Sequence, residues 1–108
     1  MPSIYEVTTT VESLEQATEL ANTLVARRLV ACAQVTGPVH SVYEWQAEVC
    51  QASEQRCTLK TSSARLANLL EILDELHPYD LPEVLVNEVG TSPGYAAWVE
   101  KQTTTAKD

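Results

Sequence analysis

Few side chains in this chain could bind a metal or act as nucleophiles. They are two histidines, His40 and His77, and three cysteines, Cys32, Cys50 and Cys57. A cysteine beside a histidine can form a nucleophile–base pair, and both residue types are common metal ligands. The sequence has no CxxC pair and no local cluster of the two types, so ligands for one ion would come from separate strands or separate subunits.

Motifs that cradle phosphate groups or expose a catalytic serine are absent as well. The sequence contains no GxGxxG, no P-loop and no GxSxG, and its three glycines could hardly supply one. We therefore predict a protein without catalytic residues and without a required cofactor.

His77 and Cys32 are the candidate metal ligands. Cys32 lies in the apolar stretch LVACAQV, where a cysteine is more often a small buried hydrophobe than a ligand. His77 follows a predicted helix, whose negative C-terminal end favours a charged imidazole. A structural role and a ligand role fit His77 equally, and its charge can change near neutral pH.

Charge narrows the choice of partners. The chain has 15 acidic and 7 basic residues, a formal net charge of −8. Nucleic-acid binding and adsorption to an anionic membrane both need a basic face, so we expect neither, and cations are the natural small partners. The odd cysteine count, and an opening MPSIYEVTTT without signal-peptide features, predict free thiols in a reducing cytoplasm.

Periodicity and capping residues predict the elements that would position these side chains. The length suits one domain, 1–108, with an ordered core of about 3–102. Ser13 with Gln16 predicts a capping box before the first helix, and Ser92 followed by Pro93 predicts the start of the last. We expect strands at 3–10, 29–35, 39–49, 56–62 and 82–89, a turn at 50–55, and helices at 14–28, 63–76 and 93–102.

This order, βαββαβ followed by a terminal helix, is typical of split βαβ units. We expect an α+β, ferredoxin-like sandwich in which helices cover one face of an antiparallel sheet. Residues 39–62 would form one long hairpin. Alternation along it predicts that Tyr43, Trp45 and Val49 share a face, with His40 and Glu44 on the other.

The stretch HPYDLPEVLV joins the second predicted helix to the last predicted strand. Pro78 ends the helix and Pro82 starts the strand, so the boundaries of these two elements explain both prolines. The boundaries do not explain His77, Tyr79 or Glu83. Lys60, a base in an acidic chain, is either an ordinary surface lysine or a partner for a carboxylate or an anionic ligand.

The segments ARRLVACAQV, SVYEW, LKT and HPYDLPEVLVNEV, with GYAAWV near the end, resemble the CutA family of divalent-cation tolerance proteins over about residues 4–101. The resemblance implies a ferredoxin-like subunit in a tight trimer, similar in architecture to PII signalling proteins. It also implies a cytoplasmic protein linked to metal tolerance, with copper binding proposed and no known reaction.

Three positions depart from the family pattern. The family usually has a cysteine near the end of the first strand, and the matching position in this chain is near Thr9. The family also has a His-His pair before the proline, where this chain has Leu76-His77. A glycine usual after the tryptophan is Ala47. Because two of the implied copper ligands are replaced, we expect copper to bind weakly here.

Two hypotheses follow. The first is a non-enzymatic homotrimer of divalent-cation tolerance that binds Cu²⁺ or another divalent cation weakly. The second is a PII-like signalling trimer that binds a small anionic metabolite in clefts between subunits. The cleft residues would be Trp45, Lys60, His77, Tyr79 and Glu83, unless these side chains only hold the trimer together.

Overall fold

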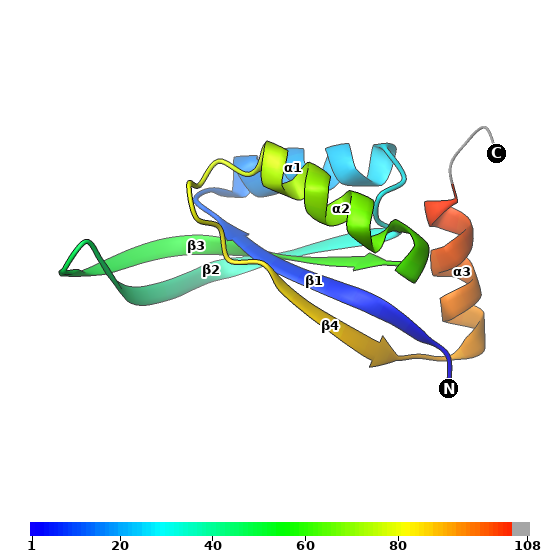
Figure 1. Cartoon of the computed structure of the whole chain (residues 1–108). Helices are drawn as coiled ribbons and strands as arrows, with labels where there is room; N and C mark the ends of the chain where they lie inside the picture. The colour runs from blue at the N-terminus through cyan, green and yellow to red at the C-terminus, as the bar shows by residue number, and fades with distance from the viewer. Residues whose placement is uncertain (105–108) are drawn as a thin grey trace.

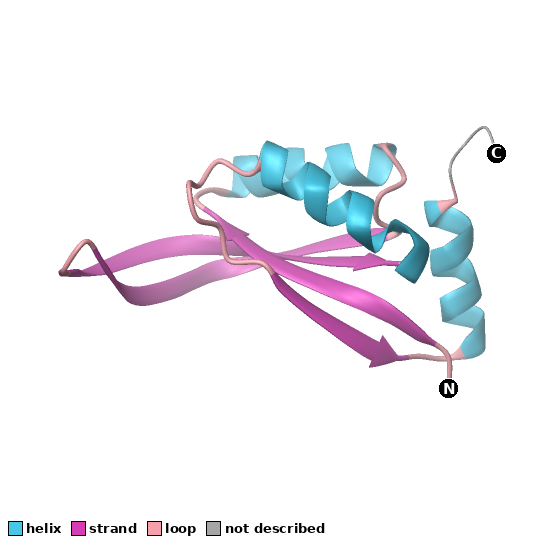
Figure 2. Cartoon of the chain, in the orientation of Figure 1, coloured by secondary structure: helices cyan, strands magenta, loops and turns pink. Residues whose placement is uncertain are grey.

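The computed structural model describes residues 1–104 and forms one four-stranded antiparallel sheet in the order β2-β3-β1-β4. Helices α1 and α2 cover one face of this sheet, and α3 lies at the end opposite the hairpin turn (Figures 1 and 2). The α+β, ferredoxin-like fold predicted from the sequence is confirmed. The elements are β1 (Ser3–Val11), α1 (Leu14–Ala26), β2 (Cys32–Trp45), β3 (Glu48–Thr61), α2 (Ser63–Leu76), β4 (Leu85–Gly90) and α3 (Pro93–Thr103).

The core lies between the sheet and the two helices. Alternate residues of β1 and β3 point toward the helices, as the two-residue period of a strand requires. They meet the leucines of α1 and α2 in a layer from which water is excluded. Its fully buried members include Val7, Val11, Cys57, Leu59, Leu24, Leu69 and Leu73.

The predicted helix starts are confirmed. The Ser13 hydroxyl accepts from the Gln16 N–H, and the Gln16 side chain accepts from the Ser13 N–H, so the capping box is complete. The Ser92 hydroxyl caps α3, with Pro93 in its first turn. The end of α1 differs from expectation: the helix stops at Ala26, and Arg28 adopts a left-handed φ of 58°.

The hairpin turn lies closer to the tryptophan than expected. The turn predicted at 50–55 is wrong: Gln46 and Ala47 make the turn with φ of 51° and 67°, and β3 begins at Glu48. Val49 therefore pairs with Glu44 and shares its face, not that of Trp45. Residues 36–39 do not break the strand but shift its register against β3.

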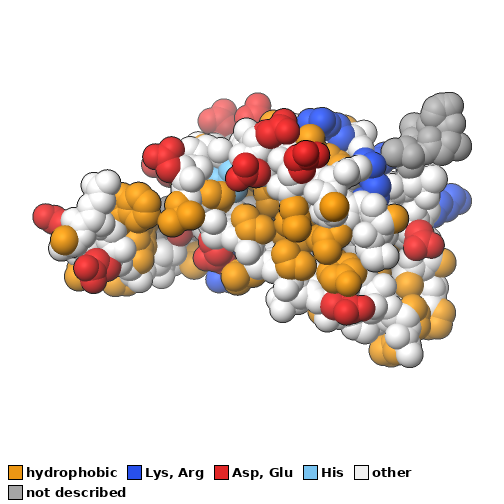
Figure 3. All heavy atoms as spheres, in the orientation of Figure 1, with side chains coloured by type: hydrophobic (Ala, Val, Ile, Leu, Met, Phe, Trp, Pro, Cys, Tyr) orange, Lys and Arg blue, Asp and Glu red, His pale blue; other side chains and the backbone are white. Residues whose placement is uncertain are grey.

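The far half of this hairpin, residues 39–54, is called the arm below. It extends beyond the helix layer, and its strands pair only with each other (Figure 1). Hydrophobic atoms are exposed on the arm and in the band between α2 and β4 (Figure 3). The exposed large side chains of the arm, of residues 81–84 and of β4 include Val42, Tyr43, Trp45, Val49, Leu81, Val84, Leu85 and Val86.

β4 begins later than expected, at Leu85. Residues 77–84 therefore form a loop from the end of α2 to the edge of the sheet. No helix within residues 1–104 is both long and apolar enough to cross a bilayer. All three cysteines lie in the described part of the chain and are free thiols.

Candidate functional site

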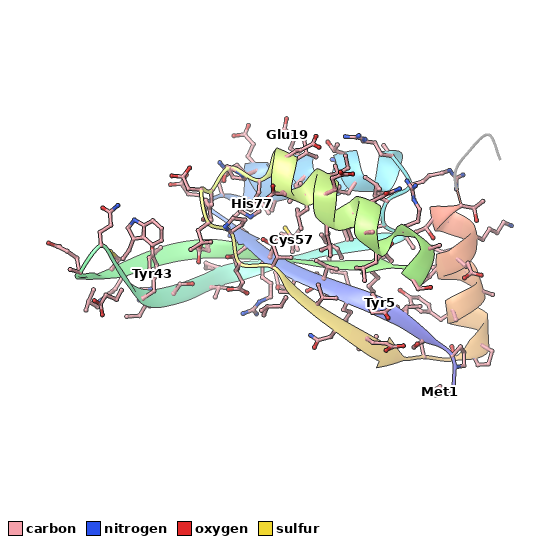
Figure 4. The ribbon with its side chains drawn as sticks, in the orientation of Figure 1. Met1, Tyr5, Glu19, Tyr43, Cys57 and His77 are labelled. Carbon is pink, nitrogen blue, oxygen red and sulfur yellow. The ribbon has the colours of Figure 1, made fainter. Side chains whose placement is uncertain are left out.

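The loop at 77–84 holds the arm where the arm leaves the sheet, and His77 anchors this loop. His77 ends α2 and is only 8% exposed. Its Nε2 lies 2.9 Å from the Thr9 hydroxyl and 3.0 Å from the Thr10 carbonyl oxygen, both on β1. The backbone N–H of Tyr79 donates to its Nδ1 at 3.1 Å. Figure 4 shows His77 between α2 and the sheet.

These bonds define the protonation state of His77. Nδ1 accepts a hydrogen bond, so the proton of the neutral ring belongs on Nε2, where it meets the Thr10 carbonyl. Burial lowers the pKa of His77, while the Thr10 carbonyl and the charge of Glu54 partly oppose this effect. We expected the end of α2 to favour a charged imidazole, but the pKa of His77 is lowered, chiefly by burial.

Tyr79 connects the loop to the arm. Its hydroxyl donates to Glu54 Oε2 at 2.7 Å, and the Ser41 hydroxyl donates to Glu54 Oε1 at the same distance. The ring of Tyr79 lies 4.9 Å from that of His77, centroid to centroid. Burial, followed by the hydrogen bond to Glu54, raises the pKa of Tyr79, which therefore stays a donor at neutral pH. We call His77, Tyr79, Glu54 and Ser41 the clamp.

The clamp is suited to holding the arm rather than to chemistry. Both nitrogens of His77 are engaged, and both carboxylate oxygens of Glu54 accept hydroxyl protons. A metal bound by His77 would displace one of these hydrogen bonds. Within residues 1–104, no group of three or more His, Cys, Asp or Glu side chains is arranged to hold an ion.

Of the five predicted cleft residues, one subunit brings together only His77 and Tyr79. Trp45 pairs with Glu48 at the tip of the arm. Lys60 belongs to the opposite end of β3, with its Nζ 6.0 Å from the centroid of the Tyr95 ring of α3. Glu83 is exposed on the loop. A cleft that joins all five residues needs more than one subunit, and it stays a prediction.

The two candidate metal ligands do not meet within one subunit. Thr9 pairs with Cys57, and Cys57 pairs on its other side with Val35, so Thr9 and Val35 are two strands apart. Cys32 lies three residues farther along β2, which places it roughly 10 Å along and 10 Å across the sheet from Thr9. A single ion held by His77 and Cys32 would therefore need two subunits.

Thr9 and Glu54 are the site residues that sequence reasoning did not assign. Thr9 occupies the position where the family resemblance places a cysteine, and its hydroxyl contacts the imidazole directly. That substitution was the available signal for Thr9. No signal identified Glu54, because it fell within the predicted turn and its partner Tyr79 is 25 residues away.

The chain matches the sequence profile of the CutA1 divalent ion tolerance protein family over residues 5–102. It is 36% identical over 104 residues to Protein CutA, chloroplastic, of Arabidopsis thaliana, covering 95% of this chain and 57% of the relative. It is 34% identical over 95 residues to the divalent-cation tolerance protein CutA of Thermus thermophilus, covering 87% and 92%. The chain thus spans little more than half of the plant relative.

Solved structures agree over nearly the whole chain. CutA from Synechococcus elongatus superimposes with a TM-score of 0.91 at 32% identity, covering 96% of this chain and 93% of that one. A protein described as the PII-like protein CutA from Nostoc, in its apo form, gives 0.87 at 34% identity, with 94% and 98% covered.

Proposed function

This chain belongs to the family of CutA1 divalent ion tolerance proteins, and from that premise we propose that it is a non-enzymatic homotrimer that acts in divalent-cation tolerance in the cytoplasm. The relatives carry the family name, and the exposed arm supports self-association. The clamp fixes the position of the arm in each subunit, so that the arm can pack against neighbouring subunits.

The arm is the observation that carries the proposal. A two-stranded hairpin that pairs only with itself is marginally stable in water. This one also exposes large apolar side chains, and Val49 is 76% exposed in the single subunit. β4 and β2 are the open edges of the sheet, and β4 exposes Leu85 and Val86. A closed ring of subunits would bury the arm and pair the edges.

The clamp geometry supports weak cation binding. Thr9 stands where the family resemblance places a cysteine, and a hydroxyl is a poorer copper ligand than a thiolate. His77 would give up a hydrogen bond on binding an ion. We therefore propose that Cu²⁺ or another divalent cation binds weakly, that His77 and Cys32 of different subunits are its ligands, and that the fold does not need it.

A second candidate function is the binding of a small anionic metabolite between subunits. Lys60 lies beside the aromatic ring of Tyr95, which itself packs on Trp98 with centroids 5.6 Å apart. A lysine beside the half-buried ring of Tyr95 and the exposed ring of Trp98 suits a planar anion. Under this second proposal the cleft between subunits is lined by Trp45, Lys60, His77, Tyr79 and Glu83. Cation tolerance is then an indirect outcome of metabolite binding.

Native mass spectrometry of the protein from its own cytoplasm tests both candidates, because it reports subunit number and any bound ion or metabolite together. We expect three subunits. A monomeric mass, checked by light scattering at micromolar concentration, would refute the assembly. Lys60→Ala should remove a bound metabolite without removing a bound cation.

Copper titration by calorimetry tests the metal proposal separately. The parent protein should bind Cu²⁺ weakly, and Thr9→Cys should tighten binding by restoring a thiolate beside His77. Tight binding that survives both His77→Ala and Cys32→Ala would show that the ion is held elsewhere.

A further inference from the structure

A groove on the helix layer lies beside the clamp but is lined by none of the four clamp residues. It lies where α1 begins and α2 ends, and its volume is about 390 Å³. Its floor is apolar, because Val11 and Leu20 are buried beneath it. Leu76, 41% exposed, and Pro78 form one wall. Gln16, Glu19 and Thr23 of α1 form the other.

Glu19 is the one acid that lines this groove, and further acids of α1 and α2 lie near it on the surface of the helices. Glu15 and Glu19 lie in the first half of α1, which contains no lysine or arginine. Asp74 and Glu75 lie in the last turn of α2, whose one basic residue, Arg65, is in its first turn. All four acids are exposed. In Figure 3 acidic atoms gather over this end of the helix layer, and Lys and Arg atoms over the other.

The acids of α2 stand where the helix itself disfavours them. The last turn of a helix carries partial negative charge on its free carbonyl groups, which favours cations. Here the last turn of α2 holds Asp74 and Glu75 and no basic residue. A cationic group supplied from outside would relieve this repulsion.

We propose that this groove is a docking site for a basic amphipathic helix of a partner protein. Apolar side chains of the partner, spaced by three or four residues, would cover Leu20 and Leu76. Its lysines or arginines would face Glu19 and Glu75 on the two sides. A nucleic acid or an anionic membrane would be repelled by the same acids. A lone metal ion lacks the donors, since residues 1–104 hold no three-ligand group.

The probe is a synthetic, fluorescein-labelled peptide of leucine and lysine, about 18 residues or five helical turns long, with leucines on one face. Binding to the full-length protein is followed by fluorescence anisotropy. A peptide of the same composition in scrambled order shows whether binding requires the leucines to lie on one face of the helix. Glu19→Lys combined with Glu75→Lys, the rim variant, reverses the charge at both positions. Glu100→Lys combined with Ala97→Lys, both at exposed positions of α3 outside the arm, is the control, and it adds three positive charges where the rim variant adds four.

We expect the rim variant to bind the peptide at least about tenfold more weakly than the parent, and the control variant to stay within about twofold. Leu76→Gln should weaken binding without changing charge. The melting temperature of Glu75→Lys should equal or exceed that of the parent, because a lysine suits a helix end. If the double variant does not fold, Glu19→Gln takes its place.

Three results would overturn the proposal. One is failure of the parent to bind the ordered peptide more tightly than the scrambled one. Another is equal weakening by the rim and control variants, which would mean attraction to net charge alone. The third is a change of oligomeric mass in the rim variant, which would show that the groove is filled by a second copy of this chain.

Discussion

The two halves of the β2–β3 hairpin differ in what surrounds them. In the half near the helices, β3 pairs with both β2 and β1, and Cys57, Leu59 and Thr61 are completely buried. In the arm the same two strands have no third strand and no helix from residues 1–104 over them, and Val42 and Val49 are exposed. One continuous pair of strands is therefore part of a core at one end and an unpartnered surface at the other.

The clamp lies at the border between the two halves. Glu54 pairs with Val39, just beyond the register shift, and receives hydrogen bonds from Tyr79 of the loop and Ser41 of β2. Beyond this point the single subunit offers the arm few contacts. The near half is stabilised by burial and the border by hydrogen bonds, and we propose that assembly stabilises the arm.

The largest effect is expected in the buried half. Leu59→Ala leaves a cavity between β3 and the helices, and should lower the free energy of unfolding by about 2–5 kcal/mol. Chemical denaturation followed by circular dichroism measures this, with parent and variant compared at the same subunit concentration because the unfolding of an oligomer depends on concentration. Val42→Ala on the arm is the matched control, and in dissociated subunits it should cost less than about 1 kcal/mol. Equal costs there would contradict the division of the hairpin into two halves.

The next effect concerns the arm and the proposed trimer. Val49→Lys places a charge on a surface that we propose to be buried between subunits, so it should shift light-scattering mass toward the monomer. The far-ultraviolet spectrum should remain folded, because Val49 makes no part of the core. Glu100→Lys, on α3, should leave the mass unchanged. An unaltered mass for Val49→Lys would remove the arm from the interface.

A smaller effect is expected at the border. Tyr79→Phe removes the hydroxyl that donates to Glu54, and should lower the free energy of unfolding by about 1–2 kcal/mol. Amide hydrogen exchange should rise in the arm more than in β1. Tyr95→Phe, at the other end of the sheet, is the matched control. Unchanged exchange in the arm would show that the clamp does not fix it.

The smallest effect is a dependence of stability on pH. Burial lowers the pKa of His77 below its ordinary value of 6.5, so the unfolded chain binds the proton more readily. The contribution of neutral His77 to the free energy of unfolding is therefore complete above pH 6.5. This contribution is lost as the pH falls below 6.5 and through the lowered pKa of the folded state. Melting temperatures measured across this window should fall less for His77→Gln than for the parent. His40→Gln, exposed on β2, should retain the parental slope.

Local sequence accounts for much of the fold. Ser13 with Gln16, and Ser92 with Pro93, carry their capping bonds within a few residues, so their helix starts could be predicted correctly. As expected from Pro78, α2 ends at Leu76, with His77 as its C-cap. The predicted position of the turn was wrong for two reasons. Gln46 and Ala47 adopt positive φ although neither is glycine, and the polar residues 50–55, which resemble a turn in composition, form a partly exposed strand.

The candidate site divides in the same way. The type and position of His77 and Tyr79 were evident from the sequence, because the prolines around them mark a defined loop. That His77 bonds to Thr9 and Thr10 and has a lowered pKa was decided only when β1 buried it, because the desolvation of its ring comes from segments far away in the sequence. Glu54 joined Tyr79 only through the register of the hairpin. Capping and chain stiffness act within a few residues and are written in the sequence, whereas burial and cross-strand pairing depend on segments that meet only in the folded chain.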